Sequence, residues 1–178
     1  MRETIHYRLT FYSKWHCGSG LAAGANADAL VVRDENGLPY IPGKTLKGFI
    51  RQAVEEMAFF ENQAPDVIQL FGAPFTNKAE TFFSNATLIE HDAILADGLT
   101  EGLFSFISQT RLTPEGIADK GSLRRIEVVV PCTLEGYIYN VDTSQKDYII
   151  HALPYIKAIG YHRNRGLGRC CIKPKLED

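Results

Sequence analysis

The residues best suited to chemistry are one aspartate and two basic segments that follow it. Asp28 precedes a turn-rich segment, and Lys44 and Lys47 then open an amphipathic helix. The second basic segment, residues 160–168, reads Gly-Tyr-His-Arg-Asn-Arg-Gly-Leu-Gly. Arginine pairs with two phosphate oxygens at once, and glycines allow a polymer backbone to approach closely. Together the segments are typical of a site for RNA or another polyphosphate, although each alone is also compatible with a solvated surface.

Residues 43–48, Gly-Lys-Thr-Leu-Lys-Gly, mark the start of a helix that we expect over residues 45–60. Its first two turns hold no acid, so free backbone N–H groups and lysines meet at one point, which suits an anion such as phosphate. Arg51 and Lys47 share its polar face. Just upstream, Asn36-Gly37 predicts a tight turn, because both residues tolerate positive φ.

In the second basic segment, each side chain suits a different part of a nucleic acid. Arg163 and Arg165 would bind phosphate, and Tyr161 or His162 would stack on a base. If the last strand of the chain lies beside the first, this loop meets the small-residue segment 18–24 and the start of the first helix. The two basic segments would then form one site.

Two roles are open to Asp28. An aspartate in a loop most often serves in a turn or a helix cap. Between two basic segments its carboxylate could instead hold a divalent metal or orient the attacking 2′-hydroxyl of RNA. Among the histidines, His16 and His162 fall in the candidate site loops and could act in acid–base roles. Spacing alone assembles no Ser-His-Asp or Cys-His triad.

Composition and charge indicate an ordinary globular chain with local basic stretches. The 178 residues are 45% hydrophobic and 22% charged, and we interpret residues 1–178 as one domain. The formal net charge is −2, yet residues 38–54 and 148–176 contain no acid, which is the local footprint of a polyanion site. No signal peptide and no apolar run of membrane-spanning length stands out, so we expect a cytoplasmic protein with no membrane partner.

The four cysteines are expected to be free thiols in a reducing compartment. None belongs to a Cys-x-x-Cys pair. A zinc site made of His16, Cys17 and the adjacent Cys170 and Cys171 is the alternative, but this spacing matches no common set of zinc ligands.

Hydrophobic periodicity predicts the elements that must position these segments. Residues 4–15 alternate as in a half-buried strand, and residues 45–60 carry an apolar stripe at helical spacing. Further strands are expected at residues 81–89, 103–107, 126–130, 133–139 and 169–173. The glycine pattern of residues 18–24 departs from the dinucleotide-binding fingerprint, and we therefore exclude a Rossmann fold.

A second helix is expected before the last strand. Ser144 and Asp147 have the spacing of a capping box, and an apolar helical pattern follows over residues 148–159. Pro154 should kink this helix, and Gly160 should end it as a C-terminal cap.

The elements thus follow one another as strand, helix, two or three strands, helix, strand. This is the βαββαβ ferredoxin-like order, an α+β fold with both helices on one face of the sheet. The irregular region 94–121 predicts an inserted, protruding hairpin, and residues 160–168 form a glycine-rich loop near the C-terminus.

A series of motifs spans most of the chain. They are Asp28, Arg33-Asp34, Asn36-Gly37-Leu38-Pro39-Tyr40-Ile41-Pro42-Gly43-Lys44-Thr45-Leu46-Lys47-Gly48, Arg51, Leu70-Phe71-Gly72, Gly121-Ser122-Leu123, Glu127-Val128-Val129-Val130-Pro131 and Ile159-Gly160 with Arg163-Asn164-Arg165-Gly166-Leu167-Gly168-Arg169. In this order they resemble the RAMP superfamily of CRISPR-associated proteins, above all the repeated backbone subunits of type III effector complexes. Tyr161-His162 departs from the pattern, since a further glycine is usual there.

The resemblance implies a modified RRM-like fold whose copies stack along a CRISPR guide RNA. It implies that Asp28 cuts the paired target RNA with a divalent metal, Mg²⁺ or Mn²⁺, and that a projecting hairpin, the thumb, wedges between the two RNAs. Residues 94–121 are our candidate for the thumb. The predicted RNA-binding residues are His16, Lys44, Lys47, Arg51, Tyr161, His162, Arg163 and Arg165.

Three functions follow as hypotheses. The first is a guide-holding effector subunit that cleaves target RNA through Asp28, with guide RNA, target RNA and other effector subunits as partners. The second is a non-catalytic RNA-binding scaffold subunit of the same kind. The third is an endoribonuclease that processes guide RNA without metal, through His16.

Overall fold

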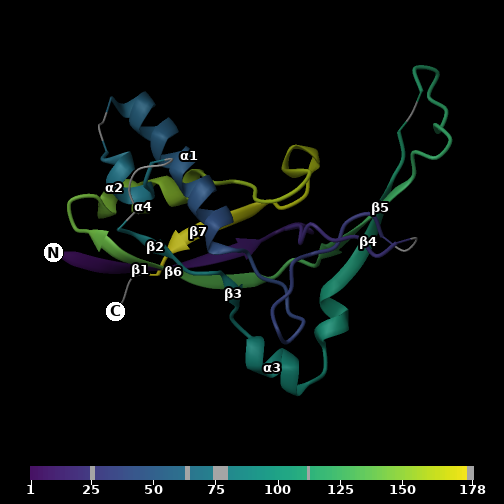
Figure 1. Cartoon of the computed structure of the whole chain (residues 1–178), viewed down its shortest axis with the longest axis horizontal. Helices are drawn as coiled ribbons and strands as arrows, with labels where there is room; N and C mark the ends of the chain where they lie inside the picture. The colour runs from purple at the N-terminus through teal and green to yellow at the C-terminus, as the bar shows by residue number, and fades with distance from the viewer. Residues whose placement is uncertain (25–26, 63–64, 74–79, 112, 176–178) are drawn as a thin grey trace.

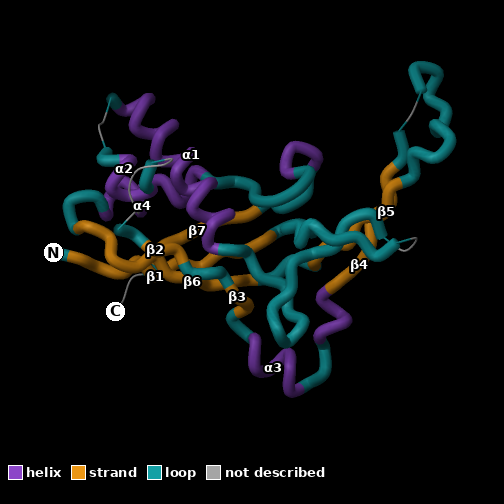
Figure 2. The backbone as a smooth tube through the Cα atoms, viewed as in Figure 1, coloured by secondary structure: helices purple, strands orange, loops and turns teal. Residues whose placement is uncertain are grey.

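A five-stranded antiparallel sheet forms the centre of the computed structural model, which describes residues 1–178 except 25–26, 63–64, 74–79, 112 and 176–178. Its strands are β1 (Arg2–Phe11), β2 (Phe82–Phe83), β3 (Thr87–Leu88), β6 (Thr133–Asp142) and β7 (Cys170–Pro174). They lie in the order β2-β6-β1-β7, and β3 also pairs with β6 (Figure 2). The order is that of a βαββαβ core, and the α+β fold is consistent with the RRM-like fold that we expected.

β1 is the central strand because both of its edges are paired, with β6 on one side and β7 on the other. Its alternation is confirmed, since Ile5, Tyr7, Leu9 and Phe11 are all buried. These side chains face the helices α1 (Gly43–Glu61) and α4 (Lys146–Ala152), which lie on one side of the sheet (Figure 1). The other side of the sheet carries the intervening polar residues of β1.

The first helix matches its prediction closely. Leu46, Ile50, Val54 and Met57 form the buried stripe that the sequence pattern indicated. Lys47 and Arg51 are half-buried on the remaining surface. α1 begins two residues earlier than expected, at Gly43.

The second helix differs from its prediction. α4 ends at Ala152, and a 3-10 turn over Leu153–Tyr155 follows, so Pro154 stands in that turn and does not kink a longer helix. Gly160 is therefore not a helix cap. The capping box is also wrong: Ser144 Oγ donates to Asp142 Oδ1 at 2.8 Å, because the helix starts at Lys146 and Ser144 lies one position before its N-cap.

A second, two-stranded sheet is built from β4 (Phe104–Gln109) and β5 (Arg124–Val129). The connection between them, described for residues 110–111 and 113–123, projects away from the body of the molecule (Figure 1). The other short helices of the described residues are α2 (Val67–Phe71), α3 (His91–Ala96) and two 3-10 helices, Thr100–Leu103 and Arg163–Arg165. In the described part of the chain, none of the helices combines the length and the apolar character needed to cross a bilayer.

Candidate functional site

Strand β5 brings the distant parts of the candidate site together. Its outer edge pairs with two segments of the long connection between β1 and α1. Trp15 and Val129 exchange backbone hydrogen bonds of 3.1 and 2.8 Å, and Ala29 forms a parallel bridge with Ile126. The segments that carry His16 and Asp28 are therefore both fixed on one strand.

Asp28 is anchored on β5 by its backbone and by its side chain. Its N–H donates to the carbonyl oxygen of Arg125 at 2.7 Å, and its Oδ2 accepts a hydrogen bond from the Arg125 N–H at 2.7 Å. Among the described residues, its Oδ1 accepts no hydrogen bond, and the side chain is exposed. The arrangement combines the anchoring role of a turn aspartate with one outward-facing carboxylate oxygen.

A buried acid holds the same loop from the other side. Glu127 is 4% exposed, and its Oε2 accepts from the Val31 N–H at 3.0 Å. Its Oε1 accepts from Arg33 Nη2 at 2.6 Å, and the Arg33 guanidinium lies 3.6 Å from the centre of the Phe104 ring on β4. The sequence analysis predicted Glu127 in a strand but not its role. The available signal was a single acid among valines, since a buried carboxylate needs a partner.

His16 is buried between strand β5 and the ring of Tyr161. Its ring is 3% exposed, and Nδ1 donates to the Glu127 carbonyl oxygen at 2.6 Å. The ring of Tyr161 meets it edge-on, with centroids 5.8 Å apart. The His16 ring packs against Tyr161 and exposes little surface of its own, so direct contact between His16 and RNA stays a prediction.

The glycine-rich loop, residues 160–168, is tied to the segment that follows β1. Tyr161 N–H donates to the His16 carbonyl oxygen at 2.9 Å, and Gly168 N–H donates to that of Lys14 at 2.7 Å. A Cβ on Gly160 would lie 2.3 Å from the His16 carbonyl oxygen, and both glycines have positive φ. Gly160 and Gly168 therefore allow the loop to pack closely against backbone of its own chain. The sequence analysis had instead expected the glycines to allow close approach of an RNA backbone.

The exposed side chains of this loop point in two directions. Arg163 lies over Phe49 of α1, 5.0 Å from its ring centre. Tyr161 and His162 pack against each other, with centroids 3.9 Å apart. Partial burial, followed by the charges of Arg165 and His16, lowers the pKa of His162. The loop thus reaches α1 as expected, but at Phe49 and not at the helix start.

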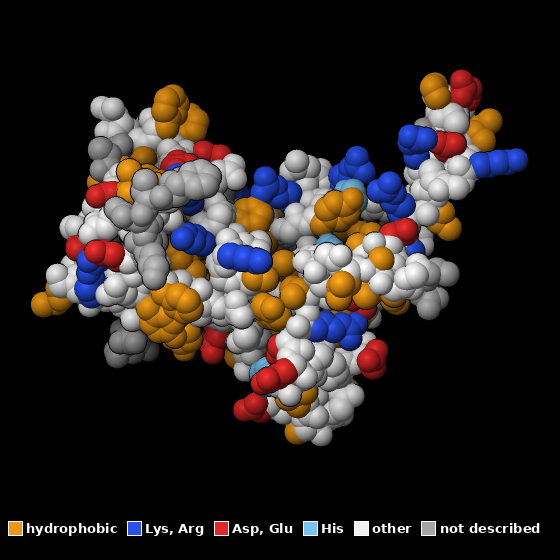
Figure 3. Space-filling model, in the orientation of Figure 1, with side chains coloured by type: hydrophobic (Ala, Val, Ile, Leu, Met, Phe, Trp, Pro, Cys, Tyr) orange, Lys and Arg blue, Asp and Glu red, His pale blue; other side chains and the backbone are white. Residues whose placement is uncertain are grey.

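A basic cleft lies between the glycine-rich loop and the β4–β5 connection. This cavity of about 620 Å³ is lined by Gln109, Thr110, Arg111, Asp119, Lys120, Gly121, Ser122, Arg124, Tyr161, His162 and Arg165. Its one acid, Asp119, is already paired with Arg111. Figure 3 shows Lys and Arg side chains gathered along the hollow between the helices and the projecting connection. We refer to it below as the basic cleft.

Of the residues that line this cleft, the sequence analysis named Tyr161, His162 and Arg165 as RNA-binding residues but missed Arg111, Lys120 and Arg124. The adjacent arginines 124 and 125, placed directly before a strong strand, were the available signal. Their meaning depends on the hairpin geometry, because only the pairing of β4 with β5 brings the connection towards the loop.

The prediction of free backbone N–H groups at the N-terminus of α1 is wrong for Gly43. The Gly43 N–H is not free for an anion, since it donates to Asn85 Oδ1 at 2.9 Å. A Cβ on Gly43 would lie 2.1 Å from the Phe83 carbonyl oxygen, so this end of the helix packs on the segment after β2. Lys44 is exposed and Lys47 half-buried on the first two turns, and their contact with RNA stays a prediction.

Arg51 has partners within the chain. Its Nε donates to Glu55 Oε1 at 2.8 Å, and its Nη1 donates to the Gly72 carbonyl oxygen at 3.3 Å. It therefore links α1 to Gly72, the C-cap residue of α2. A contact between Arg51 and RNA stays a prediction.

The described residues contain no group of three or more His, Cys, Asp or Glu side chains that could hold a metal ion. This rules out the zinc alternative within that part of the chain, where Cys17, Cys132, Cys170 and Cys171 are free thiols. A single outward carboxylate such as Asp28 does fit Mg²⁺, because Mg²⁺ is commonly bound by one or two carboxylates together with substrate phosphates and water.

Comparisons with known proteins identify the fold and the family. In fold the chain is similar to a chain of the type III-B Cmr-beta complex bound to cognate target RNA, with a TM-score of 0.75, 11% identity and 97% of each chain covered. It is likewise similar to a chain of the type III-B Cmr-beta complex in its apo state, with a TM-score of 0.73, 12% identity and 96% of each chain covered. None of the curated proteins compared with it matches. The model of the RAMP superfamily matches residues 8–171, and the chain therefore belongs to the RAMP superfamily.

Proposed function

We propose that this protein is a guide-holding subunit of a type III CRISPR effector complex. The observation that carries the proposal is the basic cleft, whose lining includes Arg111, Lys120, Arg124 and Arg165 together with Tyr161. Membership of the RAMP superfamily supports it, as does the similarity in fold to chains of a Cmr-beta complex, one of them bound to cognate target RNA.

The residues of the cleft suit the backbone of a guide RNA. Arginines bind phosphate through two parallel hydrogen bonds, and an exposed aromatic ring stacks on a base of any sequence. Tyr161 is 47% exposed and is held by His16, so its ring is presented in a fixed orientation. Base pairing would supply the sequence specificity, while the protein recognises backbone and shape.

In this proposal the β4–β5 hairpin is the thumb, the projecting hairpin that lies between guide and target RNA. Its connection projects beyond the body of the molecule, and the cleft lies at its base (Figure 1). Arg124 lines the cleft, and the next residue, Arg125, holds Asp28. A target strand paired with the guide would pass this point.

Cleavage of the target is the finer part of the proposal. Asp28 Oδ2 is fixed by the Arg125 N–H, and this orients Oδ1 outward. A bound divalent metal, Mg²⁺ or Mn²⁺, would supply charge neutralisation at the scissile phosphate. Asp28 would hold that ion and orient the 2′-hydroxyl, which would give its proton to water as its oxygen bonds to phosphorus. The bond from phosphorus to the 5′-oxygen would break, and that oxygen would take a proton from water.

The test uses the assembled complex with a matched target RNA in Mg²⁺. Asp28→Asn keeps an oxygen that can accept the Arg125 N–H but removes the charge, so we expect unchanged binding of guide and target and loss of cutting. Asp147→Asn is the control, since Asp147 is exposed on α4 and lies outside the cleft. Unchanged cleavage by the Asp28 variant would contradict the catalytic role and leave the guide-holding role intact.

A non-catalytic scaffold subunit is the second candidate, and the anchoring of Asp28 on Arg125 favours it. It predicts salt-sensitive RNA binding without metal-dependent products. The third candidate, metal-free processing of guide RNA, requires His16 to reach RNA although its ring is buried. Cleavage of precursor RNA by the full chain in EDTA, lost in His16→Ala, would support that function.

A further inference from the structure

The side of the sheet that faces away from α1 and α4 carries a row of stacked aromatic rings. His6 and Tyr137 stack with centroids 4.4 Å apart, Tyr137 and Tyr139 at 5.7 Å, and Tyr139 and Phe82 at 6.0 Å. The interplanar angles are 15°, 14° and 26°. We call these four residues the aromatic row. It crosses β1, β6 and β2, and it lies apart from the basic cleft.

The last ring of the row is open to solvent. Phe82 is 63% exposed and Tyr139 is 39% exposed. Direct cross-strand pairing explains the contacts of His6 with Tyr137 and of Phe82 with Tyr139. It does not explain why a large apolar ring at the end of the stack remains uncovered. A planar base could continue the stack on Phe82, because every base has a π face.

Cations lie next to the row on the same face. Arg8 and Lys173 are directly opposite each other on β1 and β7, and both are exposed. Like charges in this position destabilise a sheet. The acid on the other side of Arg8, Glu135, already accepts a hydrogen bond from His6 Nε2 at 3.1 Å. An anion bridging Arg8 and Lys173 would relieve their repulsion.

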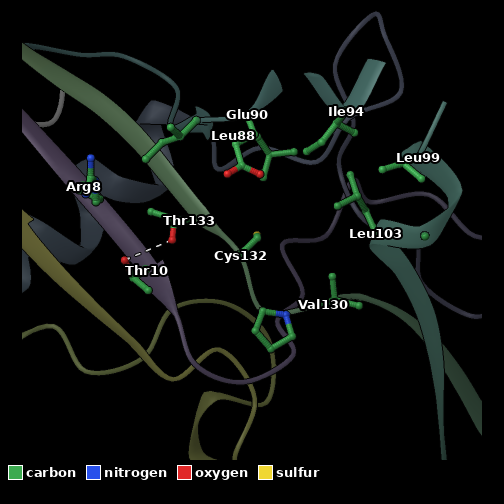
Figure 4. A pocket seen from close by; sticks show the side chains of 13 residues that line it. Arg8, Thr10, Leu88, Glu90, Ile94, Leu99, Leu103, Val130, Cys132 and Thr133 are labelled. Carbon is green, nitrogen blue, oxygen red and sulfur yellow. Dashed lines mark hydrogen bonds between the residues drawn. The ribbon is translucent and has the colours of Figure 1, made fainter. Parts of the chain in front are cut away.

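Beyond Arg8 the same face opens into a cavity of about 760 Å³. Figure 4 shows Thr10 and Thr133 on one side of it and the apolar side chains of Leu88, Ile94 and Leu103 on the other. Thr10 Oγ1 and Thr133 Oγ1 lie 3.4 Å apart. Glu90 also lines the cavity, and a carboxylate there could accept a hydrogen bond from the amino group of a base. Apolar walls with a few polar groups are typical of a small-molecule or base pocket.

Aromatic row, cation pair and cavity follow one another along β1, at His6, Arg8 and Thr10. We propose that this face of the sheet binds a short single-stranded segment of RNA. Arg8 and Lys173 hold a phosphate, a base next to that phosphate enters the cavity, and a base further along the same strand stacks on Phe82 and Tyr139 at the far end of the row. This site is separate from the basic cleft and goes beyond the function proposed for it.

The test separates base stacking from sheet stability at the exposed end of the row. Phe82→Leu keeps an apolar side chain but removes the aromatic face, whereas Phe82→Trp keeps that face. Phe60→Leu is the matched control, because Phe60 is 83% exposed on α1. All variants are made in the full chain with Arg165→Ala, so that binding in the basic cleft contributes less.

The measurement is the fluorescence anisotropy of a short, labelled, unstructured oligoribonucleotide at several salt concentrations. We expect Phe82→Leu to weaken binding about fivefold or more, since stacking on an aromatic residue contributes at least this much per base. Phe82→Trp should restore affinity, with the salt dependence unchanged in both. Arg8→Ala should lower the salt slope by about 0.7.

Equal affinities of Phe82→Leu and Phe60→Leu would overturn the proposal. So would a reconstituted complex in which Phe82→Leu releases another subunit while RNA affinity is unchanged, because the face would then be a protein interface. Neither result would affect the proposal for the basic cleft, which Arg165→Ala tests on its own.

Discussion

Replacing Glu127 tests how β5 holds the loop that carries Asp28. In Glu127→Ala, the Val31 N–H loses its acceptor and the Arg33 guanidinium loses its partner. An unsatisfied buried N–H costs about 1–3 kcal/mol. Breaking a fully buried ion pair costs about 3–5 kcal/mol, but Arg33 is 33% exposed and water screens part of this. We therefore expect a loss of about 2–4 kcal/mol in the free energy of unfolding.

The assay is equilibrium unfolding in urea, followed by fluorescence of the single tryptophan, Trp15, which pairs with Val129 on the same strand. Glu127→Gln is the matched variant, because its amide oxygen can still accept one hydrogen bond, and we expect it to lose about half as much as Glu127→Ala. A value for Glu127→Ala within about 0.5 kcal/mol of the unmodified protein would refute the reasoning, since that is the range of ordinary surface substitutions.

Three further predictions concern the glycine-rich loop. Gly168→Ala places a Cβ 1.9 Å from the Ile159 carbonyl oxygen, whereas a Cβ on Gly166 meets nothing within 4 Å. We expect Gly166→Ala to lose about 1–2 kcal/mol of stability from backbone strain alone and Gly168→Ala to lose more. Thermal unfolding of both variants measures the difference, and equal losses of stability would contradict the prediction. The pKa of His162 is lowered, so the unfolded chain binds this proton more readily, and His162 should contribute a loss of stability as the pH falls through about 6.5. His91, whose pKa is raised, contributes with the opposite sign, so the measurement compares the change in stability between pH 7 and pH 5 in the unmodified protein and in His162→Gln. The variant should lose less stability at pH 5, and an equal change in both would count against the prediction. Arg165→Ala should weaken binding of single-stranded RNA and lower the slope of log affinity against log salt concentration by about 0.7. Arg2→Ala, at the far end of β1, should leave this slope unchanged. Equal slopes in the two variants would show that Arg165 is not part of the site.

The elements with strong periodicity could be predicted from the sequence, because burial of one face determines them. The alternation of Ile5, Tyr7, Leu9 and Phe11 and the stripe of α1 both follow from the core that they share. The end of α4 could not be predicted, since a proline is compatible with either a kink or a 3-10 turn. Contact of the glycine-rich loop with α1 followed from the strand order, whereas its attachment to residues 14–16 required the backbone geometry.

The site was predicted in parts. Asp28 and Arg165 were recognisable as residue types near glycines, but neither pattern reveals that Arg125 holds Asp28 or that Arg124 lines the cleft. Those relations depend on β5 pairing with three distant segments, which no local pattern encodes. One of the N–H groups expected to be free at the start of α1, that of Gly43, likewise donates to a long-range partner, Asn85.

The central claim is that guide RNA lies in the basic cleft, between the glycine-rich loop and the β4–β5 connection. Ultraviolet cross-linking of the assembled complex, followed by mass spectrometry of the cross-linked peptides, tests it most directly. We predict that Tyr161 and the peptide containing Arg124 are joined to guide RNA, and that Arg165→Ala reduces both cross-links. Cross-links to guide RNA found elsewhere on the chain, with both of these absent, would contradict the claim.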